Sequence, residues 1–184
     1  MTLATWFAVV TICVLGAMSP GPSLALVLKQ TLTGGRRNGV ITALSHGIGV
    51  GIYAFLSILG LAAIITASPT AFSILQWGGA LYLAWLGMKG LMAKRQPDDE
   101  LPEPPTTKSA ARDGFLIAFF NPKIAVFFLA LFSQVVGTDT SLMAKFGYAA
   151  TALVIDTSWY LIVAWLFSNP KWLTLLRQKA VWFE

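Results

Sequence analysis

Two proline-containing stretches interrupt apolar runs and combine residue types that can bind charged ligands inside a membrane. They are SPGPS at residues 19–23 and NPK at residues 121–123. Proline lacks a backbone N–H and clashes with the preceding turn, so each stretch is expected to break a helix. The helix that resumes after such a break presents unpaired N–H groups and a positive dipole end, which suits a carboxylate.

The first break also predicts free backbone acceptors. The two prolines of this stretch cannot donate to the carbonyls of Gly16 and Met18, so both carbonyls are expected to face a ligand. Gly21, which lies between the prolines, has no side chain and lets a ligand approach the backbone closely.

Three ionisable residues lie inside apolar segments: His46, Lys123 and Asp156. Such groups are costly in a bilayer unless they are paired or hydrated, and they mark functional sites by default. Asp156 is expected to take a cationic amine or a proton, with a structural hydrogen bond as the alternative. His46 either carries a proton or is satisfied by a backbone carbonyl. Lys123 either stays near its break or extends to the interface. A zwitterion with a carboxylate and an ammonium fits this set.

Covalent and metal chemistry are not supported by the residue inventory. The chain has one histidine and one cysteine, no metal-ligand cluster and no phosphate-binding loop. Cys13 is interpreted as a small apolar residue of a helix. We therefore expect no enzyme activity and no cofactor.

The composition places these residues in a membrane protein. Of 184 residues, 56% are hydrophobic and 11% are charged, whereas soluble domains are about 25% charged. A spanning helix needs about 20 apolar residues. We predict an all-α integral membrane protein with a single domain over residues 1–184, in which residues 94–112 form a polar loop. The five predicted membrane helices are 3–28, 39–66, 70–91, 115–136 and 142–167.

The basic residues predict the orientation of these helices. Eleven of the thirteen lie in the connection 29–38, in the region 89–112 or after residue 170, and only Lys145 lies on the other side. Cytoplasmic loops carry the excess of Lys and Arg. The amino terminus is therefore expected to be periplasmic, and the loop 94–112 and the carboxyl terminus cytoplasmic. The net charge of +5 is a topology signal, and nucleic acid is not an expected partner.

The two breaks occur at matching positions of an internal repeat. They lie in predicted helices one and four, which cross the membrane in opposite directions, as in an inverted repeat of three helices plus three. Pro20 and Pro122 lie nine or ten residues from the nearest basic helix end, or about 14–15 Å at 1.5 Å per residue. His46 and Asp156 are also central. We expect all four residues near the midplane.

The chain resembles the lysine exporter (LysE-type) translocators, which include homoserine and threonine exporters. Three stretches carry the resemblance in order along the chain: SPGPSLALVLKQTLTGGRRNGV (19–40), QWGGALYLAWLGMKGL (76–91) and GFLIAFFNPKIAVFFLALFSQ (114–134). The family's Pro-Gly-Pro falls on residues 20–22, its Asn-Pro-Lys on residues 121–123, and its aspartate in the fifth helix on Asp156. Two positions depart from the family pattern, because Ser23 stands where asparagine is frequent and Ser133 where proline is.

The resemblance implies export of amino acids or close derivatives across the bacterial inner membrane by proton or cation antiport with alternating access. Family members have six helices, so five predicted helices imply that the sixth is missing. The alternative is a truncated, non-transporting remnant or a membrane interaction partner. The expected partners are the substrate, a proton or monovalent cation and the lipid bilayer, and the oligomeric state is left open, with a homo-oligomer as one alternative. The predicted substrate-binding residues are Ser19, Pro20, Gly21, Pro22, Ser23, Asn121, Pro122, Lys123 and Asp156, and the candidates for proton coupling are Asp156 and His46.

Overall fold

Helices account for all the regular structure of the described part of the chain. The computed structural model describes residues 3–68, 106–137 and 139–169, together with six isolated positions between 70 and 88. Most of the predicted helix 70–91 and all of residues 171–184 lie outside the described residues. The elements are α1 (Leu3–Met18), α2 (Pro22–Ala67), α4 (Thr107–Phe119), α5 (Pro122–Val135) and α6 (Leu142–Phe167).

The predicted first helix is divided at its proline stretch. Helix α1 ends at Met18 and α2 begins at Pro22, so residues 19–21 are the non-helical connection. Pro22 occupies the first helical position, where its missing N–H has no intrahelical partner in any case. The first hydrogen bond of the new helix runs from the Ala25 N–H to the Gly21 carbonyl, at 3.1 Å.

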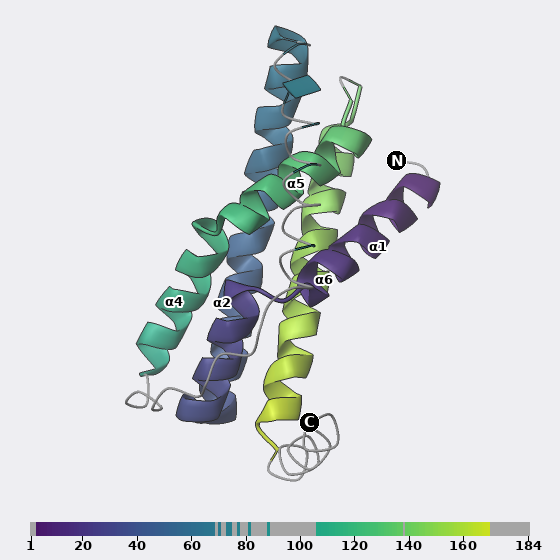
Figure 1. Cartoon of the computed structure of the whole chain (residues 1–184). Coiled ribbons are helices and arrows are strands. Elements are labelled where there is room, and N and C mark those ends of the chain that lie inside the picture. The colour runs from purple at the N-terminus through teal and green to yellow at the C-terminus, as the bar shows by residue number, and fades with distance from the viewer. Residues whose placement is uncertain are drawn as a thin grey trace.

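Helix α2 is a hairpin of two helical arms that turns at Gly35 (Figure 1). Gly35 has φ 75° and ψ 177°, a backbone conformation that essentially only glycine adopts. The first arm therefore continues beyond residue 28, where the first helix was predicted to end, and the turn at Gly35 lies within the predicted connection 29–38. Between residue 28 and Gly34 there is no helix breaker, so the helix continues, and the reversal needs only one residue.

The second break lies between α4 and α5, which are bent by 47° relative to each other. Asn121 caps α5, and Pro122 follows at its first helical position. Helix α4 begins at Thr107, within the range for which a loop was predicted. The prolines of that range end at Pro105, and the Thr106 hydroxyl caps the new helix by accepting from the Ser109 N–H.

The two broken helices run in opposite directions (Figure 1). The pair α1 and first arm of α2 descends in this view, whereas the pair α4 and α5 ascends. Helix α6 covers the range predicted for it, residues 142–167, with Ser141 as its N-cap. The second arm of α2 and α6 lie antiparallel beside these pairs. The two broken helices thus have the opposite directions that members of an inverted repeat would have.

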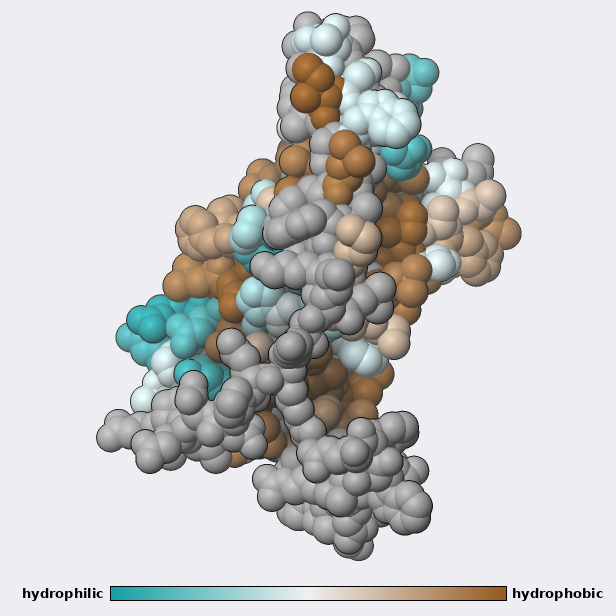
Figure 2. Space-filling view, in the orientation of Figure 1, coloured by the Kyte–Doolittle hydropathy of each residue, from teal (hydrophilic) through white to brown (hydrophobic). Residues whose placement is uncertain are grey.

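The apolar surface agrees with a membrane location. The stretch Pro22–Gly60, which includes the Gly35 turn, and α6 each contain an apolar helical window long enough to cross a membrane, and α4 with α5 qualifies as a third, bent span. Large apolar side chains are exposed on several helices, including Phe7 on α1, Ile52 on α2 and Val154 on α6. Figure 2 shows hydrophobic surface over the middle of the molecule and hydrophilic surface where α4 begins. The chain is an all-α integral membrane protein.

Glycines allow α2 to pack closely against α6. A Cβ atom on Gly47 would overlap the Thr157 side chain, and one on Gly51 would lie 2.6 Å from a methyl carbon of Leu153. Both glycines belong to a Gly-x-x-x-Gly pattern that permits such close helix contacts. This close packing brings His46, one residue before Gly47, next to Asp156, one residue before Thr157.

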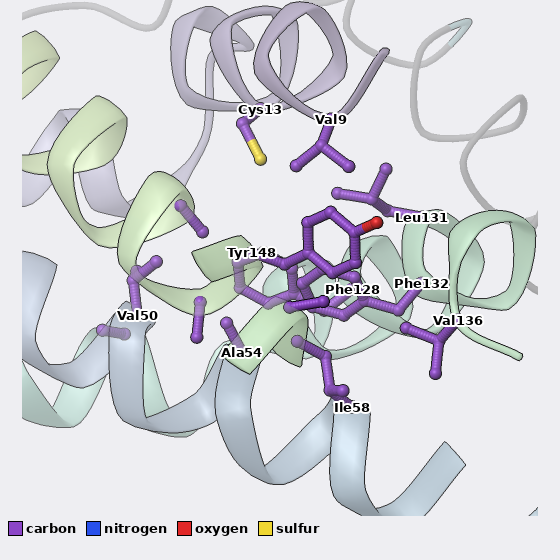
Figure 3. Close-up of a cluster of buried hydrophobic side chains, with 14 residues drawn as sticks. Val9, Cys13, Val50, Ala54, Ile58, Phe128, Leu131, Phe132, Val136 and Tyr148 are labelled. Carbon is purple, nitrogen blue, oxygen red and sulfur yellow. The ribbon is translucent and has the colours of Figure 1, made fainter. Parts of the chain in front are cut away.

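Two clusters of buried apolar side chains lie at different levels of the bundle. The first contains Val9, Val50, Phe128 and Tyr148, with further residues of α1, α2, α5 and α6 (Figure 3). The second joins both arms of α2 to the end of α6 and contains Val27, Ala43, Tyr160, Val163 and Ala164. The buried polar residues Ser23, His46 and Asp156 lie between these levels along their helices.

Candidate functional site

A cavity of about 50 Å³ lies where the two helix breaks meet. A single water needs about 10–15 Å³ of such volume, so the cavity has room for a few waters. Its walls come from α1, α2, α5, α6 and the residues of the two breaks. They comprise Cys13, Gly16, Ala17, Ser19, Gly21, Pro22, Ser23, His46, Val50, Asn121, Lys123, Ile124, Phe127, Phe128, Ala152, Asp156 and Tyr160.

Ser23, His46 and Asp156 form a continuous hydrogen-bonded series. His46 Nδ1 lies 2.7 Å from Asp156 Oδ2, and His46 Nε2 lies 2.8 Å from Ser23 Oγ. A carboxylate accepts, so Nδ1 donates to it; in the neutral ring Nε2 then accepts from the Ser23 hydroxyl. His46 is fully buried, whereas 12% of the Asp156 side chain is exposed. The exposed part leaves the carboxylate accessible from the cavity.

Asn121 connects the second break to this series. Its Oδ1 accepts from the Lys123 N–H at 3.0 Å, which caps α5, and its Nδ2 donates to Ser23 Oγ at 3.3 Å. The amide thus satisfies a free N–H of the helix start and fixes the position of the Ser23 hydroxyl. Asn121 is 5% exposed, so these bonds are largely shielded from competing solvent.

Lys123 connects the second break to the first. Its Nζ donates to the Ser19 carbonyl at 2.8 Å, the Ser19 hydroxyl at 2.9 Å and the Pro20 carbonyl at 3.0 Å. An ammonium has three N–H donors, and these three oxygens use all of them. Lys123 therefore stays at the break, and the alternative that it extends to the interface was wrong for this structure.

The backbone acceptors at the first break differ from those predicted. The Ser19 N–H is shared between the Leu15 carbonyl at 3.1 Å and the Gly16 carbonyl at 3.3 Å, as is common at helix ends. The carbonyls that bind a charged group are those of Ser19 and Pro20. Both residues lie outside the helices, so their carbonyls have no donor from a helical turn.

The structure brings the predicted site residues together around one cavity, with two exceptions. Pro20 does not line the cavity and contributes only its carbonyl to Lys123. Pro122 does not line it either, and its role is to begin α5. The residues on the cavity wall are Ser19, Gly21, Pro22, Ser23, His46, Asn121, Lys123 and Asp156.

Several cavity residues were not predicted. The Tyr160 ring lies 4.9 Å from the His46 ring, edge to face, and its position one helical turn after Asp156 was a usable signal. Phe127 packs on Gly16, where an added Cβ would lie 2.5 Å from the ring. Cys13, interpreted as a small apolar residue, is buried and also lines the cavity.

The donor set suits proton exchange and zwitterion binding. Among the described residues, no three His, Cys, Asp or Glu side chains come together as a metal site would require. The cavity combines one ammonium, one carboxylate and one imidazole with apolar and aromatic walls. Such a set provides an opposite charge for each end of an amino acid and an imidazole that can carry a proton.

Comparison with known proteins connects this geometry to transport. The chain is 28% identical to the "Threonine efflux protein" of Escherichia coli (strain K12), over 99% of this chain and 91% of that protein. It is 30% identical to the "Homoserine/homoserine lactone efflux protein" of Salmonella typhimurium, over 85% and 77%. It is 32% identical to the "Leucine efflux protein" of Enterobacter sp. (strain 638), over 77% and 69%. No solved structure matches the chain significantly.

The family assignment rests on nearly the whole chain. The family model described as LysE type translocator matches residues 14–183, which include both helix breaks, His46 and Asp156. A translocator family agrees with the expectation that the chain is not an enzyme. The chain belongs to the LysE type translocator family.

Proposed function

We propose that this chain is a secondary transporter that exports amino acids or close derivatives across the bacterial inner membrane. Relatives over most of the chain bear the names of threonine, homoserine and leucine efflux proteins. The observation that carries the proposal is one cavity, between two oppositely directed broken helices, that holds both Lys123 and Asp156. A zwitterionic amino acid has a complementary charge for each of them.

The substrate ammonium binds at Asp156. Only one carboxylate oxygen of this residue, Oδ2, accepts from His46, so the other is available to a ligand in the cavity. The first turn of α2 supplies N–H groups that have no intrahelical acceptor, at Ser23 and Leu24. Their positive end suits the carboxylate of the substrate. Ser19, Gly21, Pro22, Asn121 and Lys123 complete the wall, while Pro20 and Pro122 shape the backbone.

Proton coupling operates through the pair of His46 and Asp156. His46 is the single histidine of the chain, and its ring contacts Asp156 and Tyr160 from α6 and Ser23 from α2. Lys123 from α5 and Cys13 from α1 are the other titratable residues on the cavity wall. A proton on the pair neutralises the charge that holds the substrate ammonium. Proton and substrate therefore compete, as an antiporter requires.

Alternating access proceeds by movement of residues 3–68, which contain the first break, relative to residues 106–169, which contain the second. On one side the cavity shares Cys13, Val50, Phe128 and Ala152 with the first apolar cluster. On the other side Tyr160 belongs to the second cluster. When the side chains of one apolar cluster separate, the cavity becomes accessible from that side of the membrane, while the other cluster keeps it closed from the opposite side.

The end of the molecule with the Gly35 turn faces the cytoplasm. Lys29, Arg36 and Arg37 are exposed near this turn, and Lys108 and Arg112 are exposed at the beginning of α4, at the same end. Lys145 lies at the opposite end, near the start of α6. An excess of basic residues marks the cytoplasmic side. The amino terminus is then periplasmic, and the connection 94–112 and the carboxyl terminus are cytoplasmic.

A transport assay tests the proposal. The purified chain is reconstituted in liposomes loaded with labelled L-threonine, L-homoserine or L-leucine, and a proton gradient is imposed with the acidic side outside. We expect at least one amino acid to leave faster than from empty liposomes and faster than without the gradient. If none of the twenty amino acids leaves the liposomes under any gradient, export is rejected. If efflux is equally fast with and without a proton gradient, proton coupling is rejected.

A further inference from the structure

The Lys123 ammonium lies in the membrane domain without an anionic partner among the described residues. Its three printed acceptors are neutral oxygens, two of them backbone carbonyls and one a hydroxyl. The carboxylate on the same cavity wall, Asp156, is bonded to His46 instead. Hydrogen bonds that join an ammonium to a carboxylate are about twice as strong as neutral ones. An anion that enters the cavity therefore competes well for Lys123.

The contact between Lys123 and the first break is built into the local structure. A Cβ atom on Gly21 would lie 3.2 Å from Lys123 Nζ and 3.5 Å from its Cδ, so a side chain at this position would crowd the lysine. The base of the lysine is fixed as well, because Asn121 accepts from its backbone N–H. The side chain thus spans from the start of α5 to the end of α1 in a defined path.

The first break contains the groups that allow Lys123 to exchange its backbone carbonyl partners for a carboxylate of a ligand. Ser19 and Pro20 have carbonyls that depend on Lys123, whereas the N–H groups of Ser23 and Leu24 precede the first helical hydrogen bond of α2, made by Ala25. A carboxylate placed here accepts from Lys123 and from the helix start together. The ammonium of the same ligand stays at Asp156, on the same cavity wall.

We propose that Lys123 binds the carboxylate of the substrate and, in doing so, releases the Ser19–Pro20 carbonyls that it holds in the empty protein. The exchange breaks the bonds from Lys123 to the Ser19–Pro20 carbonyls, which join residues 3–68 to residues 106–169. These two parts of the chain can move relative to each other only when such bonds break. The ligand class is an α-amino acid with a free carboxylate. Carboxamides, which keep the amine but lose the anionic group, cannot displace the carbonyls in this way. This inference rests on the proposed function.

Matched ligand pairs test the requirement for a carboxylate on the wild-type chain. The pairs are L-threonine with L-threoninamide and L-leucine with L-leucinamide, each measured by efflux from proteoliposomes. We expect the free acid of a pair to be exported about ten- to hundredfold faster than its neutral partner, the range for losing a charge-assisted hydrogen bond. Equal export of acid and neutral derivative would overturn the inference and leave the proposed function intact. If neither acids nor derivatives are exported, it is the proposed function that fails.

Variants of Lys123 test the same residue directly. Lys123→Met should reduce export of the free acids about tenfold or more while changing export of the neutral derivatives little, so that the preference disappears. Lys123→Arg keeps the charge and should keep the preference. Lys108→Met, at an exposed position in the first turn of α4, is the matched control and should behave as wild type. A preserved preference in Lys123→Met would reject Lys123 as the carboxylate receptor.

Cys13 reports the bond that Lys123 makes in the empty protein. It is the single cysteine of the chain, it is buried, and it lines the same cavity. Without ligand, alkylation by N-ethylmaleimide should be severalfold faster in Lys123→Met than in wild type or Lys108→Met, because the first break is no longer held. An unchanged rate in a variant that is folded by its thermal transition would show that the bond does not hold the cavity closed.

Discussion

The polar side chains of the site bond the two halves of the chain to each other. Asn121 contacts Ser23, Lys123 contacts Ser19, and Asp156 contacts His46, so each pair joins residues 3–68 to residues 106–169. Removing one partner of a buried hydrogen bond leaves the other polar group unsatisfied, which costs about 1–3 kcal/mol. The site therefore stabilises the bundle as well as serving a ligand, and isosteric substitutions separate the two roles best.

Asp156→Asn should abolish the response of export to a proton gradient. The asparagine carbonyl can still accept from His46 Nδ1, so the fold is retained, but the amide neither titrates nor attracts an ammonium. We expect efflux to fall about tenfold or more, equivalent to about 1.4 kcal/mol, with no dependence on the gradient. Asp113→Asn, whose native carboxylate pairs with Arg112 on α4, is the control and should export normally. Gradient-driven efflux by Asp156→Asn at the wild-type rate would contradict this role.

Sequence reasoning placed the site residues at one depth but did not give their contacts. Counting residues from basic helix ends puts Pro20, His46, Pro122 and Asp156 at similar levels, and the cavity forms where their helices meet. Which side chains touch depends on the rotation of each helix about its axis, which an apolar segment with no polar face does not reveal. For this reason the bond of His46 to Asp156 and the contact of Tyr160 with His46 were not predicted.

At the scale of elements, three of the described helices follow a residue whose side chain accepts from a free N–H of the first turn. Thr106, Asn121 and Ser141 accept from the first turns of α4, α5 and α6. Prolines and glycines predicted the breaks well, because their effect on the backbone is local. The start of α4 was not predicted, because it directly follows a proline-rich polar stretch. The continuation of the first arm of α2 to Gly35 was not predicted, because the charged Lys29 ends the apolar run.

The caps at Asn121 and Ser141 offer a matched comparison of a cap inside the site with a cap outside it. Asn121→Ala and Ser141→Ala should each lower stability by about 0.5–2 kcal/mol, seen as a lower thermal transition in detergent. Only Asn121→Ala should also reduce export, since it loses the bond to Ser23 and the restraint on Lys123. Equal export by the two variants would show that the cap at residue 121 is purely structural.

Two glycines of α2 offer a second matched comparison. Gly47→Ala places a methyl group into the Thr157 side chain and pushes α2 from α6, which should cost about 1–3 kcal/mol. Gly60 has no neighbour within 4 Å of an added Cβ, so Gly60→Ala should be neutral or stabilise the helix by up to about 1 kcal/mol. Thermal unfolding in detergent measures both. A Gly47→Ala protein as stable as wild type would mean that α2 and α6 can separate at no cost.

At the scale of the whole molecule, exposed basic residues gather at the end where α2 turns and α4 begins. The composition and the spacing of apolar segments were sufficient to predict an all-α membrane protein. Which helix faces pack together was not predictable, because lipid-facing and buried apolar residues are chemically alike. The observed packing instead follows from small residues such as Gly47 and Gly114, which set how closely two helices approach.

Reporter fusions test the proposed orientation. Alkaline phosphatase, which is active only outside the cytoplasm, should be active when fused after residue 68 and inactive when fused after residue 105. Green fluorescent protein should give the opposite pattern at the same two positions. These outcomes follow from the basic residues that lie near Gly35 and at the start of α4. The reverse pattern in both reporters would place the Gly35 turn outside.

The charges in the cavity have a consequence for how voltage acts on the protein. Lys123 and Asp156 sum to zero with a neutral His46, and a zwitterionic amino acid adds no charge. Only the proton-loaded form is charged, so in the proposed antiport cycle the membrane potential acts on the return step alone. One charge that crosses the membrane gains about 2.3 kcal/mol per 100 mV. An interior-negative membrane therefore drives export even when the pH is equal on both sides.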